Sequence, residues 1–305
     1  MTKEKIRIPR KIIIPSIYKK NAKFRYLLTG FSKLGISTFE SDRLNQAYEE
    51  SKPYPFNIVY GKGDERRAYL DVAASKFKHY PELMNLGAYY FKTHLALEDL
   101  SRYERMFPMP QATSNLKIFL DLVRLRKTWQ RGRHKYDIVA VFVNSDGGIR
   151  QQAVEMIRAQ KNWKSKAWMI AHKRLQRPPI PDELIGNKLS YREHLHVQSQ
   201  SLLSLGLTGA MKNQGASCSF RHVEIWAMGA CLITTPPETV FVGNPKDCWI
   251  EVKSDLSDFV DVVDWAITHK RECRKIANNG REYFDKYLTP EAHALHILRT
   301  IQECE

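Results

Sequence analysis

The stretch from Tyr136 to Lys161, YDIVAVFVNSDGGIRQQAVEMIRAQK, most constrains the fold. Its first ten residues form the strongest strand pattern in the chain. A glycine turn, Asp146-Gly147-Gly148, then opens a helix. A buried strand that runs through a short turn into a helix is typical of β-α-β units, which form mostly parallel sheets. The sequence therefore predicts an α/β protein.

The same alternation continues on both sides of this stretch. On the N-terminal side we expect strands at 11–17, 55–61 and within 83–95, and helices at 23–34 (ended by Gly35), near Ala68–Tyr80 and at 114–131 (capped by Ser114). On the C-terminal side we expect strands at 166–172, 201–207 and 229–234, helices at 190–200 (capped by Ser190) and 219–228, two helices broken near Asn278–Gly280, and a last helix from Pro290. Two β/α halves with a seam near 133–136 indicate two facing Rossmann-like domains with a cleft between them.

Positive charge is concentrated in the first half of the chain. The net charge is +15, and residues 1–136 hold 27 basic and 13 acidic side chains, whereas residues 137–305 hold 21 and 20. The cluster RLRKTWQRGRHK (124–135), which includes Arg131 and Arg133, adds to this asymmetry. We expect the N-terminal half to meet an anionic partner, which is nucleic acid, a phosphorylated glycan or a lipid surface; scattered surface lysines that only confer solubility are the alternative.

The cysteines and the apolar runs point to a reducing compartment. The five cysteines are widely spaced and form no CxxC pair, so buried thiols are expected in place of disulfides or a zinc ribbon. No apolar run reaches the length of a signal or spanning segment. A cytoplasmic protein is therefore expected, either free or peripheral at the membrane.

Two turns at expected strand ends could hold phosphate. Gly147 and Gly148 expose backbone N–H groups at a helix start, and Arg150 in the first turn can make a two-pronged contact with a diphosphate. His172 and Lys173 follow the next expected strand, where ligands of parallel sheets bind. A tight turn with solvated side chains is the alternative at both places.

A third candidate site lies in LTGAMKNQGASCSFRHVEIWAMGACLIT (207–234). Its glycine-containing loop, with Gly209 and Lys212, can wrap close to a ligand. Ser219 can cap the helix that follows, and Arg221 and Glu224 share one helix face. Here a carboxylate can accept two ribose hydroxyls while the guanidinium neutralises phosphate; an internal Arg–Glu pair in a capped helix is the alternative.

The run S-x-R-x-x-E-x-x-A-x-G-A-x-x-I (219–233) resembles the donor half of GT-B glycosyltransferases, in particular the protein O-glucosyltransferase, exostosin and spore-maturation-like families. Residues 252–290 are similar to the tail of the protein O-glucosyltransferases, with an SDL.D…W….IA…F…YL pattern. The resemblance covers about residues 136–300. It implies phosphate contact by Arg221 and ribose contact by Glu224. YYFKTHL also looks like a YFK element of related transferases, which implies that Lys92 faces the cleft.

This resemblance implies a division into three parts. Residues 1–135 would form a basic acceptor-side domain, 136–288 a nucleotide-sugar-binding domain, and 289–305 a helix that packs back toward the first domain. The donor would be a nucleotide sugar, UDP-linked in preference to GDP-linked, and no other cofactor is expected. The double-glutamate pattern of retaining relatives is missing, because Thr-Thr-Pro-Pro follows the helix and its strand.

The expected reaction is an inverting transfer without a metal ion. Positive side chains and a helix terminus can stabilise the leaving pyrophosphate. The base that deprotonates the acceptor hydroxyl is expected in the N-terminal half, with Asp64 as first candidate and His94 as second. The acceptor would be anionic: modified DNA, or a phosphorylated or lipid-linked glycan at a membrane. A non-catalytic nucleic-acid-binding protein on the same fold is the alternative.

Overall fold

The computed structural model describes residues 6–16, 22–45, 53–71, 87–113, 115–143, 148–171, 180–207, 218–236 and 240–305. The chain forms two compact units. Unit 1 comprises Met1–Ser114, Glu238–Gly243 and Asp285–Glu305, and unit 2 comprises Asn115–Pro237 and Asn244–Phe284. The chain first passes from unit 1 to unit 2 between Ser114 and Asn115, which is before the expected seam at 133–136. The division into acceptor-side and donor-side domains stays a prediction.

Unit 1 is built on a six-stranded mixed sheet of order β2-β1-β3-β4-β5-β6. Its strands are β1 (Lys11–Ile14), β2 (Ser37–Glu40), β3 (Tyr54–Gly61), β4 (Asp64–Asp71), β5 (Tyr89–Lys92) and β6 (Met106–Pro108). β3 runs antiparallel to β1 and β4, whereas β4, β5 and β6 are parallel. The N-terminal half is therefore α/β, but its sheet is less uniformly parallel than the alternating pattern predicts.

One expected helix in unit 1 is a strand instead. The sequence predicts a polar loop at 62–67 and a helix from Ala68, whereas Asp64–Asp71 forms β4 and makes a hairpin with β3. The burial along β4 alternates at first and then becomes continuous, since its C-terminal half lies in the middle of the sheet. The rest of the expected helix, 72–80, lies outside the described residues.

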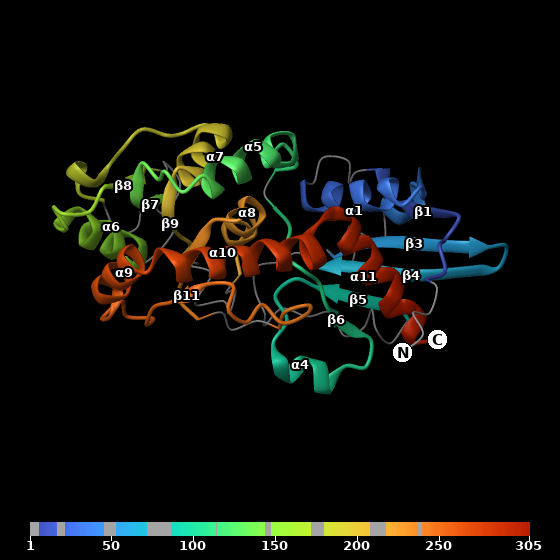
Figure 1. Ribbon diagram of the computed structural model, residues 1–305. Helices are drawn as coiled ribbons and strands as arrows, with labels where there is room; N and C mark the ends of the chain where they lie inside the picture. The colour runs from blue at the N-terminus through green and yellow to red at the C-terminus, as the bar shows by residue number, and fades with distance from the viewer. Residues whose placement is uncertain are drawn as a thin grey trace. The chain divides into compact units, whose positions relative to one another are not determined.

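Helices cover both faces of the unit 1 sheet. α1 (Ala22–Lys33) and α11 (Pro290–Glu303) lie side by side on one face, and α4 (Leu97–Arg102) lies near β6 (Figure 1). The main core holds Phe24 and Phe31 of α1, Phe56 of β3 and Ile297 of α11. The last helix packs within unit 1 and is capped by Thr289; Pro290 lies in its first turn, as predicted.

Unit 2 contains a five-stranded parallel sheet of order β11-β10-β9-β7-β8. Its strands are β7 (Tyr136–Val143), β8 (Ser165–Ile170), β9 (Ser201–Leu205), β10 (Cys231–Thr234) and β11 (Ile250–Glu251). Numbered along the chain, these strands have the doubly wound order 2-1-3-4-5. In such sheets the chain changes direction between the first and third strands, here β7 and β9, and ligands bind beyond their carboxyl ends.

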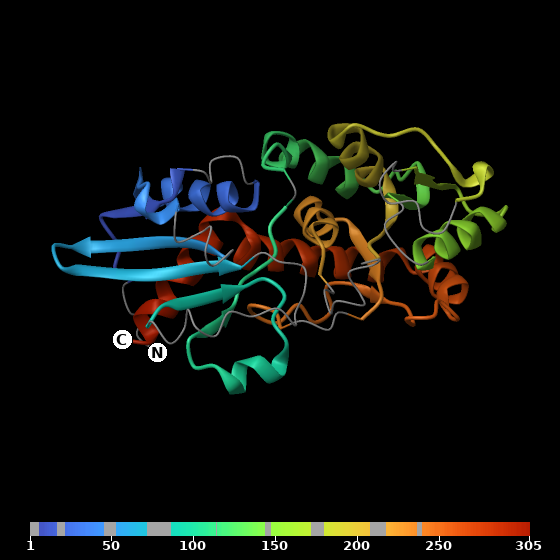
Figure 2. The same cartoon turned by 180° about the vertical axis from the view of Figure 1, so that it is seen from behind.

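Six α-helices accompany this sheet in the described residues (Figure 2). They are α5 (Ile118–Gln130), α6 (Ile149–Ala159), α7 (Tyr191–Ser199), α8 (Phe220–Met228), α9 (Phe259–Thr268) and α10 (Lys270–Tyr283). A 3-10 turn at Asp182–Leu184 precedes α7, and a π-helical turn at Phe284–Leu288 follows α10. The expected cap Ser190 is present: its hydroxyl accepts from the Glu193 N–H, and the Glu193 carboxylate accepts from the Ser190 N–H.

Two expected helix boundaries differ from the structure. α10 continues through Asn278–Gly280, and the break lies at His269, between α9 and α10. Gly280 lies inside α10 and does not end it. The helix packs against Trp226 at this position, where an added Cβ would lie 2.5 Å from the indole ring. The helix expected from 114 begins at Ile118, and Ser114 lies outside the described residues.

The thiols are free, as expected, and four of them are buried: Cys218, Cys231, Cys248 and Cys273. Cys304 is exposed, which differs from the expectation of buried thiols. No helix within the described ranges has the length and apolar character needed to cross a membrane.

Candidate functional site

Arg150 joins the two strand ends at which the unit 2 sheet changes direction. Its Nε and Nη2 donate to the carbonyl of Leu207, just beyond β9, at 3.0 and 2.7 Å, and its guanidinium lies over the Phe142 ring of β7. A third contact, at 3.4 Å, reaches the carbonyl of Val143 at the end of β7. Arg150 therefore braces the edge where a ligand is expected.

Of the expected glycine turn before Arg150, the structure describes Gly148. Gly148 is the N-cap of α6 and has a φ of 101°, a backbone conformation that glycine adopts without strain. Gly147 lies outside the described residues, as do four other residues of the expected donor site: His172, Lys173, Gly209 and Lys212.

The start of α8 is held by His222, to which the sequence patterns assign no role. The backbone N–H of Ser219, the N-cap of α8, donates to His222 Nδ1 at 3.2 Å. Nδ1 is therefore an acceptor, so the ring proton lies on Nε2 and is donated to Thr234 Oγ1 at 2.8 Å. The Thr234 hydroxyl in turn donates to the carbonyl of Gly206 at 2.7 Å. This chain ties the start of α8 to the end of β10 and to the segment after β9.

His222 is neutral in this setting. Burial, followed by the charges of Arg150 and Arg221, lowers the pKa of His222 to about 3. Its ring is fully buried. A neutral imidazole with both nitrogens engaged positions the helix and is unsuited to carry charge toward a ligand.

Arg221 and Glu224 form the pair that their spacing predicts. Arg221 Nη1 lies 3.3 Å from Glu224 Oε2, and the Tyr191 hydroxyl donates to Glu224 Oε1 at 3.0 Å. The Glu224 carboxylate is fully buried, whereas 22% of the Arg221 side chain is exposed. Arg221 is therefore mostly buried but is the more exposed member of the pair, and its guanidinium is held by Glu224, which Tyr191 holds in turn.

A second buried histidine lies close to this pair. Burial and the positive charge of Arg221 hold the pKa of His194 well below its usual value. Its Nε2 is buried without a hydrogen-bond partner in the described part of the chain. A neutral His194 lets Arg221 carry the positive charge at this place.

In unit 1, the carboxyl ends of β4 and β5 bring together a buried polar cluster. Lys92 Nζ lies 2.7 Å from Asp71 Oδ2, and the Tyr90 hydroxyl donates to the same oxygen at 2.6 Å. The Lys92 side chain is fully buried and the Asp71 side chain is 4% exposed. Lys92 therefore neutralises an internal carboxylate, which differs from the expectation that it faces a cleft.

The two candidate bases lie at opposite ends of the unit 1 sheet. Asp64 is the first residue of β4, and its carboxylate pairs with Arg66 at 2.8 Å and with Arg7. Asp64 follows the end of β3, but the strand-end argument concerns parallel strands, and β3 runs antiparallel to both β1 and β4. His94 follows β5 at the Asp71 end of the sheet and is fully buried.

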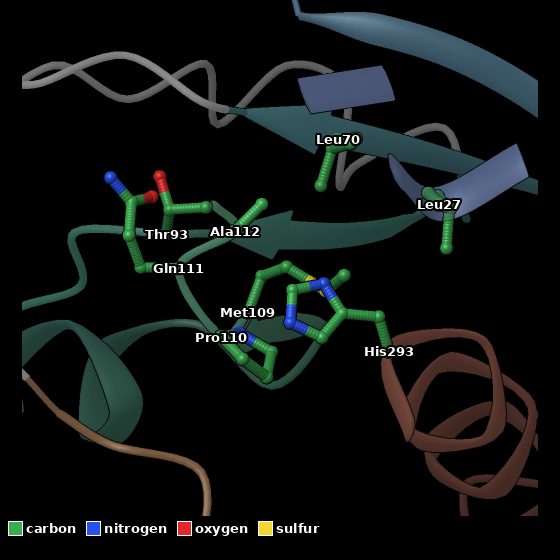
Figure 3. A pocket seen from close by; sticks show the side chains of 8 residues that line it. All are labelled: Leu27, Leu70, Thr93, Met109, Pro110, Gln111, Ala112 and His293. Carbon is green, nitrogen blue, oxygen red and sulfur yellow. The ribbon is translucent and has the colours of Figure 1, made fainter. Parts of the chain in front are cut away.

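A pocket lies beside this strand edge within unit 1 (Figure 3). Its lining comes from α1, the ends of β4 and β5, the segment after β6, and α11: Leu27, Leu70, Thr93, Met109, Pro110, Gln111, Ala112 and His293. Within the described residues, Gln111 Oε1 and His293 Nε2 are buried without a hydrogen-bond partner. Burial lowers the pKa of His293 to about 3, so its ring is neutral.

The two expected acceptor-side arginines lie outside unit 1. Arg131 caps the end of α5, and Arg133 follows it; both are exposed. They belong to unit 2, whereas Lys92 belongs to unit 1.

Sequence reasoning missed Tyr191, His222, Thr234 and Asp71. Ser190 signalled the start of α7, but no pattern indicates that the next residue reaches Glu224. Asp71 was missed because the sequence predicts a helix near 68–80, whereas Asp71 is the last residue of strand β4. In the described residues, no group of three or more His, Cys, Asp or Glu side chains is placed to hold a metal ion.

Residues 150–299 match the model of a family described as glycosyl transferase-like. The match begins at Arg150 and includes Ser219, Arg221 and Glu224. The match covers 150 of the 305 residues and most of the doubly wound sheet of unit 2, so this part of the chain is similar to glycosyl transferase-like proteins.

Two solved structures are also similar to the chain. A glycosyltransferase from Rickettsia africae aligns over 96% of this chain and 98% of its own, with 10% identity and a TM-score of 0.49. The C-terminal domain of a glycosyl transferase group 1 family protein from Francisella tularensis aligns over 58% of this chain and 95% of its own, with 14% identity and a TM-score of 0.35. No protein with a curated description matches the chain.

Proposed function

We propose that the protein transfers a sugar from a nucleotide-sugar donor to a hydroxyl of an anionic acceptor, with inversion and without a metal ion. The observation that carries this proposal is the partly exposed Arg221, held by the buried Glu224 at the start of α8. This pair lies within the segment that matches the glycosyl transferase-like family.

The donor is proposed to bind beyond the carboxyl ends of β7 and β9. Arg221 contacts the diphosphate, whereas the expected ribose contact of Glu224 does not fit its carboxylate, which is fully buried and bound to Arg221 and Tyr191. The remaining donor contacts are proposed at the strand-end loops and their helix starts: Gly147, Gly148, Arg150, His172, Lys173, Gly209, Lys212 and Ser219. A UDP-sugar is the first donor to test.

The leaving nucleotide acquires negative charge as the glycosidic bond breaks. An arginine and a helix N-terminus next to that charge stabilise it without a metal ion. Arg221 lies in the first turn of α8, so both elements occur together at one place.

An inverting transfer needs a base for the acceptor hydroxyl. His94, directly after β5, is the candidate that we propose in preference to Asp64, which is paired to two arginines at the opposite end of β4. The excess of basic residues in the chain fits two classes of acceptor, modified DNA and a phosphorylated or lipid-linked glycan.

Thermal unfolding in the presence of UDP-, GDP-, CDP- and ADP-sugars tests the donor site. We expect one nucleotide to raise the Tm by several degrees, because a ligand that binds only the folded state stabilises it. Arg221→Gln and Glu224→Gln should remove that increase while the proteins stay folded.

Arg192→Gln is the matched control, since Arg192 is an exposed arginine of the same unit that pairs with Asp121. It should keep the full increase. No increase with any nucleotide, or an unchanged increase in both the Arg221 and Glu224 variants, would refute the proposed donor site.

A further inference from the structure

The outer face of α5 exposes two large apolar side chains. Leu120 is 84% exposed and Val123 is 69% exposed. They are three residues apart and therefore adjacent on the helix surface. Single exposed apolar residues are ordinary, but an adjacent pair on one helix face indicates an interaction surface.

Four cations surround this pair on the same face. Lys117, Arg124, Lys127 and Arg131 are all exposed. Together with Leu120 they follow each other at intervals of three or four residues (117, 120, 124, 127, 131), which is the spacing of one helix face. We define the outer face of α5 by these five residues and Val123.

The opposite side of α5 is fixed to unit 2. Ile118, Leu125 and Trp129 are buried. Arg126 Nε donates to the carbonyl of Ala227 in α8 at 2.7 Å. The helix cannot rotate to hide its apolar pair without losing this packing.

The outer face of α5 is positively charged because the one acidic residue of this helix is neutralised by ion pairs. Asp121 is the only acidic residue of α5, and it pairs with Arg124 at 3.1 Å and with Arg192 at 2.9 Å. These guanidinium groups lower the pKa of Asp121. Lys117, Lys127 and Arg131 add positive charge that no acid of α5 balances.

We propose that the outer face of α5 binds the surface of a bilayer that contains anionic lipids. The cations contact lipid phosphates, and Leu120 and Val123 enter the apolar boundary below the headgroups. Duplex DNA would also attract the cations but offers no apolar layer for the pair. A second copy of the same face would bring like charges together.

This inference goes beyond the proposed function. It assigns the protein a peripheral membrane contact and favours an acceptor carried by the membrane over modified DNA. The outer face of α5 does not include Arg221, Glu224 or His94, so its test requires neither donor nor acceptor. Failure of one proposal is therefore distinguishable from failure of the other.

Co-sedimentation with vesicles tests the inference. We expect the protein to sediment with vesicles of phosphatidylcholine and phosphatidylglycerol, to remain in solution with phosphatidylcholine alone, and to be released by salt. The double variant K117Q/K127Q should bind about 25-fold more weakly, since each cation near an anionic surface contributes about fivefold. L120S/V123S should bind about tenfold more weakly at unchanged charge.

Phe39→Ser is the matched control, because Phe39 is 52% exposed on β2 of unit 1. It should bind vesicles as the parent protein does, and equal Tm values for all variants would show that the fold is kept. Three results would overturn the inference: no binding of the parent protein to anionic vesicles, unchanged binding of L120S/V123S, or a dimer in solution that these two substitutions dissociate. Binding to duplex DNA that displaces the vesicles and is insensitive to L120S/V123S would also overturn it.

Discussion

The hydroxyl of Tyr191 donates a hydrogen bond to Oε1 of Glu224 across 3.0 Å. This bond joins the first residue of α7 to a fully buried carboxylate of α8. The same hydroxyl also lies 3.3 Å from the carbonyl of Asn115, just before α5. One side chain thus connects three segments of unit 2 beneath Arg221.

Tyr191→Phe should lower the free energy of unfolding by about 1.5–3 kcal/mol, the value of a hydrogen bond to a charged group. Urea denaturation measures this loss. Arg192→Ala, at the neighbouring position, removes only a surface ion pair and should cost less than about 1 kcal/mol. Equal losses in the two variants would contradict a structural role for the Tyr191–Glu224 bond.

Lys92→Met should destabilise the protein by about 3–5 kcal/mol, because it leaves the Asp71 carboxylate buried without its ammonium partner. The double variant D71N/K92M removes both charges and should recover part of that loss. Urea denaturation of the single and double variants measures the difference. A double variant as unstable as the sum of its single variants would show that Lys92 and Asp71 act independently.

Much of unit 2 could be predicted from the sequence because its strands are continuous apolar runs ended by polar turns. YDIVAVFV and SLLSL became β7 and β9, and the spacing of Arg221 and Glu224 predicted their pairing. Unit 1 was harder to predict. DERRAYLD reads as a polar loop before a helix, and only its pairing with β3 makes it a strand.

The supporting contacts of the site could not be predicted because they depend on tertiary structure. Tyr191 and Glu224 are 33 residues apart, and His222 and Thr234 meet only because α8 packs against β10. The burial of Lys92 follows from its place on an inner strand of a sheet whose order the sequence did not reveal. The expectation that Lys92 faces a cleft rested on the resemblance of YYFKTHL to an element of related transferases, which does not reveal the burial of this side chain.

His222 should make stability depend on pH. Its pKa is about 3 in the folded protein and about 6.5 in an unfolded chain, so between these values only the unfolded state binds a proton. The stabilisation is therefore complete above about pH 6.5 and falls as the pH is lowered, by about 1.4 kcal/mol per pH unit.

His222→Asn tests this dependence, because Asn keeps an acceptor near the Ser219 N–H but binds no proton. Urea denaturation from about pH 7.5 to about pH 5.5 should show the variant less stable at the upper end. The difference from the parent protein should shrink as the pH falls. A constant difference would show that His222 does not titrate in the unfolded chain over this range or is not neutral when folded.

Gly30→Ala should destabilise the protein although the position lies inside α1, where alanine usually adds about 1 kcal/mol. A Cβ at Gly30 would lie 1.9 Å from the carbonyl oxygen of Pro290 and 3.1 Å from the Cβ of Ala294, so α11 must move away from α1. We expect a net loss of about 1–3 kcal/mol, seen as a lower Tm. Ser32→Ala, at an exposed position of the same helix, should leave the Tm unchanged or raise it slightly. A Tm for Gly30→Ala at or above that of the parent protein would contradict the close packing of α1 against the start of α11.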